Sequence, residues 1–134
     1  MRKLLPLLAG TLLLGAASAQ AEPVNREAEL ARALEGRVAG EPVDCISLNR
    51  VRSTRVIPGT AIIYEVGNTL YVNRPRAGAR SLDRWDALVS RPFGNQLCSV
   101  DVIQLYDTSS RITHGAVFLD EFVPYRRVRT SSRD

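Results

Sequence analysis

Two turn signals in the middle of the sequence separate three short segments rich in β-branched and aromatic residues. Pro58-Gly59 fits the centre of a type II turn, because proline sets the first backbone angle and glycine accepts the second. Gly67-Asn68 is a two-residue connection of the kind that closes a tight hairpin. We therefore expect an antiparallel meander of strands 51–57, 60–66 and 69–73, with the cross-strand pairs Tyr64–Tyr71 and Ile63–Val72.

The rest of the sequence adds one helix and further strands to this meander. Asn25 is a suitable N-cap, and Leu30, Ala33, Leu34 and Val38 recur at helical spacing before Gly40 and Pro42 end the pattern. Residues 97–106 resemble one strand, and residues 112–123 supply one or two more up to Pro124. The predicted fold is mainly β (α+β): a five- to six-stranded antiparallel sheet or small open barrel with one N-terminal helix packed on it.

The segment between the meander and the later strands has two loops. Ser81 is a candidate cap for a short helical turn that places Leu82, Trp85 and Leu88 on one side. A single tryptophan in such a stripe is interpreted as a core residue rather than as a ligand platform.

The first 21 residues have the layout of a secretory signal peptide. Arg2 and Lys3 precede an uncharged, largely apolar run, which ends in two small-x-small triplets between Ala17 and Ala21. Both triplets fit a cleavage site, and we favour cleavage after Ala21. The run is shorter than the ~20 residues of a membrane-spanning helix, so a retained anchor is the weaker interpretation. We expect a periplasmic or secreted protein with no transmembrane segment after cleavage.

Composition indicates a single domain at residues 22–125, with a basic polar tail at residues 126–134. The formal net charge is +4, and two of the positive charges belong to Arg2 and Lys3 in the predicted leader. The remaining chain mixes both signs of charge, which excludes the footprint of a nucleic-acid-binding protein. Every basic residue after Lys3 is arginine, and arginine can hold carboxylate or phosphate through two parallel hydrogen bonds.

Cys45 and Cys98 are the only cysteines. In an exported chain, two cysteines favour one disulfide, which here would close a loop of about 54 residues. The rival interpretation is a reactive thiol. It is disfavoured because Asp44 beside Cys45 would raise the pKa of the thiol rather than lower it.

Four arginines in or beside one loop, Arg74, Arg76, Arg80 and Arg84, form the first candidate anion-binding site. Only Asp83 lies among them. The hypothesis is that this loop grips an anionic group such as a lipid phosphate, a polysaccharide carboxylate or an acidic protein face. A second and weaker candidate is the C-terminal set Arg126, Arg127, Arg129 and Arg133.

Catalytic and metal-binding patterns are sparse. His114 is the one histidine, and no Gly-x-Ser-x-Gly elbow accompanies it, so a Ser-His-Asp site is the weaker interpretation. Asp83 and Asp86 could share a helix face, whereas Asp120 and Glu121 would point to opposite faces of a strand. We expect no catalytic residue, no metal and no cofactor.

Several short motifs resemble a family of small exported proteobacterial proteins of unknown function. These are the motifs at 42–48, 54–57, 70–73, 96–98 and 122–125, which read PVDCISL, TRVI, LYVN, QLC and FVPY. The likeness covers roughly residues 26–125 and implies an envelope location and a compact single domain, but no activity. Relatives carry further cysteines near the positions of Ala79–Arg80 and Val117, which this chain lacks, so a pairing of Cys45 with Cys98 stays open at this point.

The sequence therefore predicts a non-enzymatic binding or structural protein of the bacterial envelope. Its partner is expected to be an anionic envelope component or a secreted protein. The alternatives are an inhibitor or accessory subunit of a secreted enzyme and, less favoured, a small hydrolase that uses His114.

Overall fold

The computed structural model describes residues 24–129, which contain one α-helix and ten β-strands. The predicted signal peptide and Arg133 lie outside the described residues. Helix α1 spans Val24–Ala33, and short 3-10 helices span Leu48–Arg50 (η1) and Ala79–Ser81 (η2). The strands are β1 (Arg37–Ala39), β2 (Cys45–Ser47), β3 (Val51–Ile57), β4 (Ala61–Val66), β5 (Thr69–Asn73), β6 (Asp86–Ser90), β7 (Gln96–Cys98), β8 (Val102–Asp107), β9 (Ile112–Phe118) and β10 (Phe122–Arg127).

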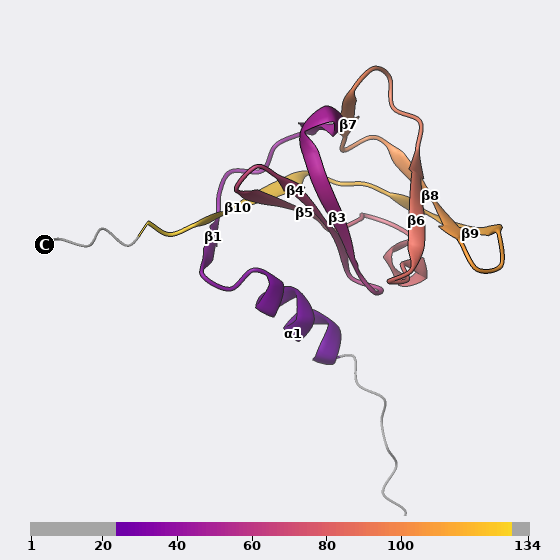
Figure 1. The fold of residues 1–134 in the computed structure, drawn as a ribbon, viewed down its shortest axis with the longest axis horizontal. Coiled ribbons are helices and arrows are strands. Elements are labelled where there is room, and N and C mark those ends of the chain that lie inside the picture. The colour runs from indigo at the N-terminus through magenta and orange to yellow at the C-terminus, as the bar shows by residue number, and fades with distance from the viewer. Residues whose placement is uncertain (1–23, 130–134) are drawn as a thin grey trace, which may run out of the picture.

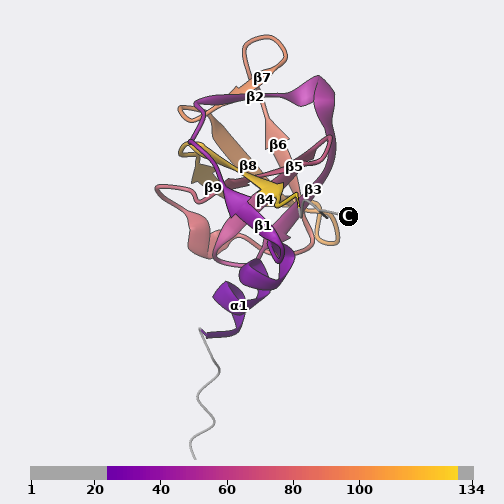
Figure 2. The same ribbon diagram turned by 90° about the vertical axis from the view of Figure 1, so that its left-hand side faces the viewer.

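The strands form three sheets that do not close into a barrel (Figures 1 and 2). The largest has the order β1-β10-β5-β4-β3, the second has the order β6-β8-β9, and β2 pairs with β7. All the pairings are antiparallel. The predicted mainly β class with one helix is confirmed.

The predicted meander is present as β3, β4 and β5. Tyr64 lies opposite Tyr71 and Ile63 opposite Val72, as the hairpin turn predicts. At the first turn, Thr60 N–H donates to Ile57 O at 3.0 Å. Gly59 there has φ +63°, the positive angle that the third position of a type II turn requires.

Both faces of the meander are covered, which explains why β4 is apolar at nearly every position. Ile62 and Tyr64 belong to a core that includes Ile103 and Leu105 of β8. On the opposite face, Ile63 packs in a smaller core with Leu30 of α1, which is 2 % exposed. Burial of a leucine side chain contributes roughly 1.5–3 kcal/mol, and this contact fixes α1 on the sheet. Val38, the last residue of the predicted helical stripe, lies instead in β1 and is exposed.

The single strand predicted over residues 97–106 is divided into β7 and β8. The Asp101 side chain causes the break, because its carboxylate accepts a hydrogen bond from Cys98 N–H at 2.7 Å. Asp101 N–H in turn donates to Cys98 O at 3.0 Å. These contacts make a tight turn that the apolar pattern did not reveal.

The predicted helical turn with Trp85 in the core is wrong. Leu82 is buried, but Leu88 lies in β6 and Trp85 is 77 % exposed. Two local contacts turn the chain before β6: Trp85 N–H donates to Asp83 Oδ1 at 3.0 Å, and Asp83 N–H donates to Asp86 Oδ2 at 2.9 Å. The aspartates at this spacing favour a turn rather than a helix.

The prediction that Pro124 ends the last strand is also wrong, because β10 continues to Arg127. Gly40 N–H donates to Pro124 O at 2.7 Å. The carbonyl and the nitrogen of a strand residue face the same side, so the nitrogen of Pro124 points past the end of β1 and not at β5. The proline therefore removes no ladder bond to β5. Asp120 and Glu121 lie in the connection before β10 and not on opposite faces of a strand.

Within residues 24–129, no helix is long and apolar enough to cross a membrane.

Candidate functional site

Two of the four arginines of the first anion-binding hypothesis are paired with carboxylates of α1. Arg74 holds Glu27 through two hydrogen bonds of 2.8 and 3.0 Å. Arg84 holds Glu29 in the same two-pronged geometry, at 2.8 and 3.0 Å. The hydrogen bonds from the guanidinium groups lower the pKa of both glutamates. These arginines anchor α1 from two ends of the loop, which is a structural role.

The other two arginines of that loop form no salt bridge among residues 24–129. The guanidinium of Arg76 donates to Ser99 O at 3.1 Å, across to the turn after β7. Arg80 lies on η2 and is exposed. The four arginines thus have different surroundings: two hold carboxylates, one donates to a backbone carbonyl, and Arg80 is exposed.

The second arginine set lines a pocket. Arg126, Arg127 and Arg129 border an open pocket of 390 Å³ together with Asn68 and Thr69. No carboxylate is among these lining residues. No salt bridge to the three arginines occurs among residues 24–129. The pocket therefore presents cationic groups whose charge the described residues leave uncompensated.

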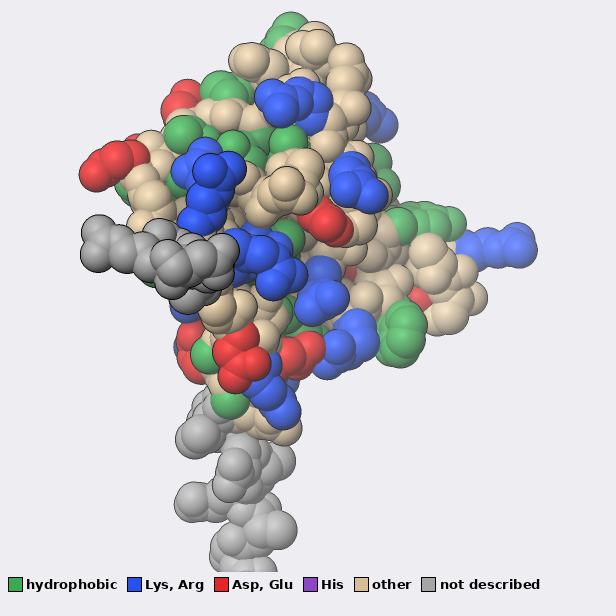
Figure 3. All heavy atoms as spheres, turned by 60° about the vertical axis from the view of Figure 1, so that its left-hand side comes forward, with side chains coloured by type: hydrophobic (Ala, Val, Ile, Leu, Met, Phe, Trp, Pro, Cys, Tyr) green, Lys and Arg blue, Asp and Glu red, His purple; other side chains and the backbone are tan. Residues whose placement is uncertain are grey.

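Arg37 of β1 holds the hairpin turn beside this pocket. Its guanidinium donates to Asn68 O at 2.8 Å and to Tyr125 O at 3.1 Å, so it ties the β4–β5 turn to β10. Arg37 lies directly opposite Arg127 in the ladder between β1 and β10. Figure 3 shows arginine side chains across the middle of this face and several acidic side chains at its lower end, over α1.

His114 lies in a separate pocket of 280 Å³ bordered by Asp83, Trp85, Asp86, Asp107 and Ser109. Its Nε2 is 2.7 Å from Oδ1 of Asp86, whose side chain is 3 % exposed. The Ser109 hydroxyl donates to Asp107 Oδ1 at 2.6 Å. No hydrogen bond within residues 24–129 joins a serine hydroxyl to His114. The arrangement is an imidazole–carboxylate pair without a serine nucleophile on the imidazole.

The hydrogen bond to Asp86 raises the pKa of His114, and the carboxylates of Asp107 and Asp83 act in the same direction. Because the folded-state pKa lies above the unfolded value, protonated His114 stabilises the fold fully below about pH 6.5. That stabilisation is lost as the pH rises through the folded-state pKa.

We expect Asp86→Asn to lower the pKa of His114, because the variant removes the carboxylate that stabilises the protonated imidazole. Proton NMR titration checks this directly, because a single histidine gives one resonance to follow. An unchanged pKa in the variant would contradict the pairing.

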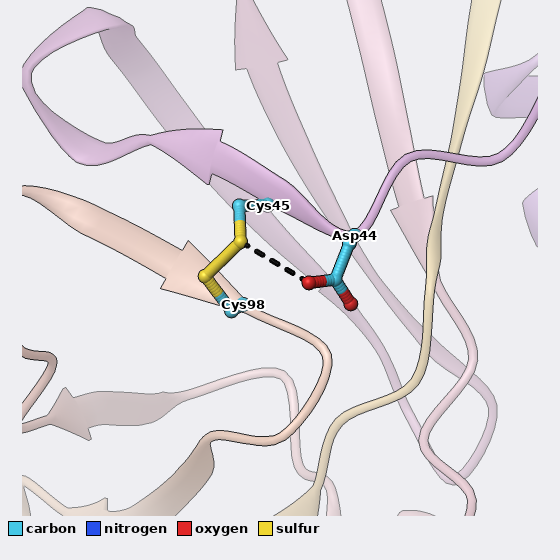
Figure 4. Close-up of side chains that lie close together, drawn as sticks. All are labelled: Asp44, Cys45 and Cys98. Atoms are coloured by element: carbon cyan, nitrogen blue, oxygen red, sulfur yellow. Dashed lines mark hydrogen bonds between the residues drawn. A yellow bond between two sulfur atoms is a disulfide. The ribbon is translucent and has the colours of Figure 1, made fainter.

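Cys45 and Cys98 form a disulfide between paired residues of β2 and β7, with an Sγ–Sγ distance of 2.07 Å (Figure 4). Asp44 lies beside the bridge, with a carboxylate oxygen 3.5 Å from Cys45 Sγ. This contact is not a true hydrogen bond, because a disulfide sulfur carries no proton. The three side chains are close enough to hold a metal ion, but oxidised sulfurs are not the thiolates that metals bind.

Sequence reasoning missed the pocket around Asp107. Hydrogen bonds from Ser109 and Ser110 hold the pKa of the Asp107 carboxyl well below its usual range. The Asp-Thr-Ser-Ser run at residues 107–110 is typical of a turn, and its spacing is the signal for this local capping. Residue spacing could not reveal that this turn lines the same pocket as Trp85 and His114.

Comparison with protein-family models, with curated proteins and with solved structures found no match for this chain.

Proposed function

We propose that this chain is a non-enzymatic, exported binding domain that holds an anionic component of the bacterial envelope. The observation that carries the proposal is the pocket lined by Arg126, Arg127 and Arg129 with two uncharged residues. Guanidinium groups bind phosphate and carboxylate oxygens through paired hydrogen bonds. The Cys45–Cys98 disulfide supports an oxidising compartment outside the cytoplasm.

The arginine pocket is a better candidate than the loop of residues 74–84. In that loop Arg74 and Arg84 already have glutamate partners, so an incoming anion would have to displace a carboxylate. At the pocket, no carboxylate of residues 24–129 is paired with the arginines, so an incoming anion displaces none of these groups. This difference favours the pocket at β10 over the loop as the anion-binding site.

The test is binding to vesicles of phosphatidylglycerol and to soluble polyphosphate, with phosphatidylcholine vesicles as the uncharged reference. We expect binding to the anionic probes that weakens as salt is raised. The triple variant Arg126→Gln, Arg127→Gln, Arg129→Gln is expected to bind about 30-fold more weakly, since three exposed ion pairs of roughly 0.7 kcal/mol each contribute about 2 kcal/mol. Preference for vesicles over polyphosphate would identify the lipid headgroup as the source of the phosphate.

A matched control removes the same charge elsewhere. Arg80, Arg91 and Arg111 are exposed residues that do not line the pocket at β10, and their replacement by glutamine is expected to change binding less than threefold. Equal loss in both triple variants would indicate a response to net charge alone and would contradict a site at β10.

A further inference from the structure

Two strands leave open edges on the same side of the molecule. In the three-stranded sheet, residues 76–77 pair with the end of β9, because Arg76 N–H donates to Phe118 O and Phe118 N–H donates to Ala77 O, both at 3.0 Å. The opposite edge strand, β6, pairs only with β8. In the five-stranded sheet, β3 is an edge strand of seven residues and pairs only with β4. Half of the backbone N–H and C=O groups of such strands point outward without a ladder partner.

The open edges of β3 and β6 border one groove. Thr54, Arg55 and Val56 of β3 line it on one side, and Arg84, Asp86 and Leu88 line it on the other, around a volume of 390 Å³. In Figure 1, β3 and β6 are neighbouring strands that belong to different sheets. The groove therefore offers unpaired backbone groups from two directions.

We propose that this groove binds an extended, acidic segment of a partner protein as an added β-strand between β3 and β6. Strand addition to an open edge takes its affinity from backbone hydrogen bonds and its specificity from alternate side chains. The inference goes beyond the proposed function, because it concerns a different surface and a peptide instead of an envelope anion.

The charges around the groove favour an acidic occupant. Arg52 and Arg55 are exposed on β3, and neither forms a salt bridge among residues 24–129. The one carboxylate in the lining, Asp86, is bound to His114. The nearby Glu29 forms its salt bridge with Arg84. The positive charge of Arg55 also contributes to the lowered pKa of Glu29, but the two residues form no salt bridge. Free charge along this edge is positive.

The same arginines argue against a second copy of this chain as the occupant. Pairing of two β3 edges would bring Arg52 and Arg55 of both copies onto one short ladder, and like charges opposite each other destabilise a strand pair. Charged residues on an edge protect it from self-association. An acidic strand at the same edge would instead be attracted by Arg52 and Arg55.

The test uses the disulfide-bonded protein labelled with ¹⁵N and a synthetic hexapeptide of alternating glutamate and valine. We expect peptide binding with a dissociation constant below about 1 mM. Amide shifts and slowed hydrogen exchange are expected at residues 52–56 and 86–90. N-methylation of alternate peptide residues is expected to abolish binding, because it removes the backbone donors. A peptide with lysine in place of glutamate is expected to bind at least tenfold more weakly.

Two protein variants separate this groove from the β10 pocket. The double variant Arg52→Gln, Arg55→Gln is expected to bind the peptide at least tenfold more weakly than wild type. The double variant Arg126→Gln, Arg127→Gln is expected to bind it with unchanged affinity. The proposal is overturned if the acidic peptide protects no amide of β3 or β6 at about 5 mM. It is also overturned if N-methylation has no effect, or if the shifts lie on β10.

Discussion

Replacement of both Cys45 and Cys98 by serine is expected to lower the free energy of unfolding by about 4 kcal/mol. The bridge joins residues 53 positions apart, so its loss frees a long loop in the unfolded chain. The two strands that it joins, β2 and β7, have three residues each and little ladder of their own. A domain of this size has a total free energy of unfolding of about 5–15 kcal/mol, so the variant loses a large share of its stability. Urea denaturation of the two proteins measures the difference.

Reduction of the wild-type protein with dithiothreitol is expected to reproduce the effect of the double serine variant. Gln96→Ala is the matched control, because it changes an exposed side chain on β7 and leaves the bridge intact. That variant is expected to lie within about 0.5 kcal/mol of wild type. A double serine variant as stable as Gln96→Ala would show that the bridge contributes no net stability.

Gly78→Ala is expected to destabilise the protein by about 3 kcal/mol, from two separate causes. Gly78 has φ +84°, a conformation that costs an L-residue about 1 kcal/mol. An added Cβ would also lie 3.1 Å from Val117 Cα and closer still to Ala116 O. Both are backbone atoms of β9 that cannot rotate away, and such overpacking costs about 1–3 kcal/mol. Thermal and urea unfolding measure the loss.

Gly67→Ala separates the two causes. Gly67 also has a positive φ, but a Cβ there would meet nothing within 4 Å. The Gly67→Ala variant is therefore expected to lose only the stability that the positive φ angle costs an alanine, about 1 kcal/mol. If both alanine variants are equally stable, the close approach of residue 78 to β9 has no energetic weight.

The parts of the fold that could be predicted from sequence are those fixed by neighbouring residues. The meander and the register of its second hairpin were predicted, because the turns at Gly59 and Gly67 and the flanking β-branched residues act locally. Strands β1 and β2 were not predicted. With three residues each, they are too short for an alternation to stand out, and their partners lie far away in the chain.

The candidate site was predicted only in part, for a similar reason. The disulfide between Cys45 and Cys98 was predicted from the expected export of the chain and from the presence of only two cysteines. The roles of Arg74 and Arg84 could not be predicted, because their glutamate partners lie 47 and 55 residues away. Trp85 was misplaced because apolar spacing cannot distinguish a buried stripe from a turn held by carboxylates.

The place of β10 has a consequence for how the molecule is made. It is the last described strand in chain order, yet it lies between β1 and β5 inside the largest sheet. A nascent chain that has reached only Glu121 therefore has β1 with no neighbour to join, whatever its earlier segments have formed. Contacts between segments so distant in sequence slow folding, so the largest sheet of an emerging polypeptide stays incomplete until β10 has been synthesised.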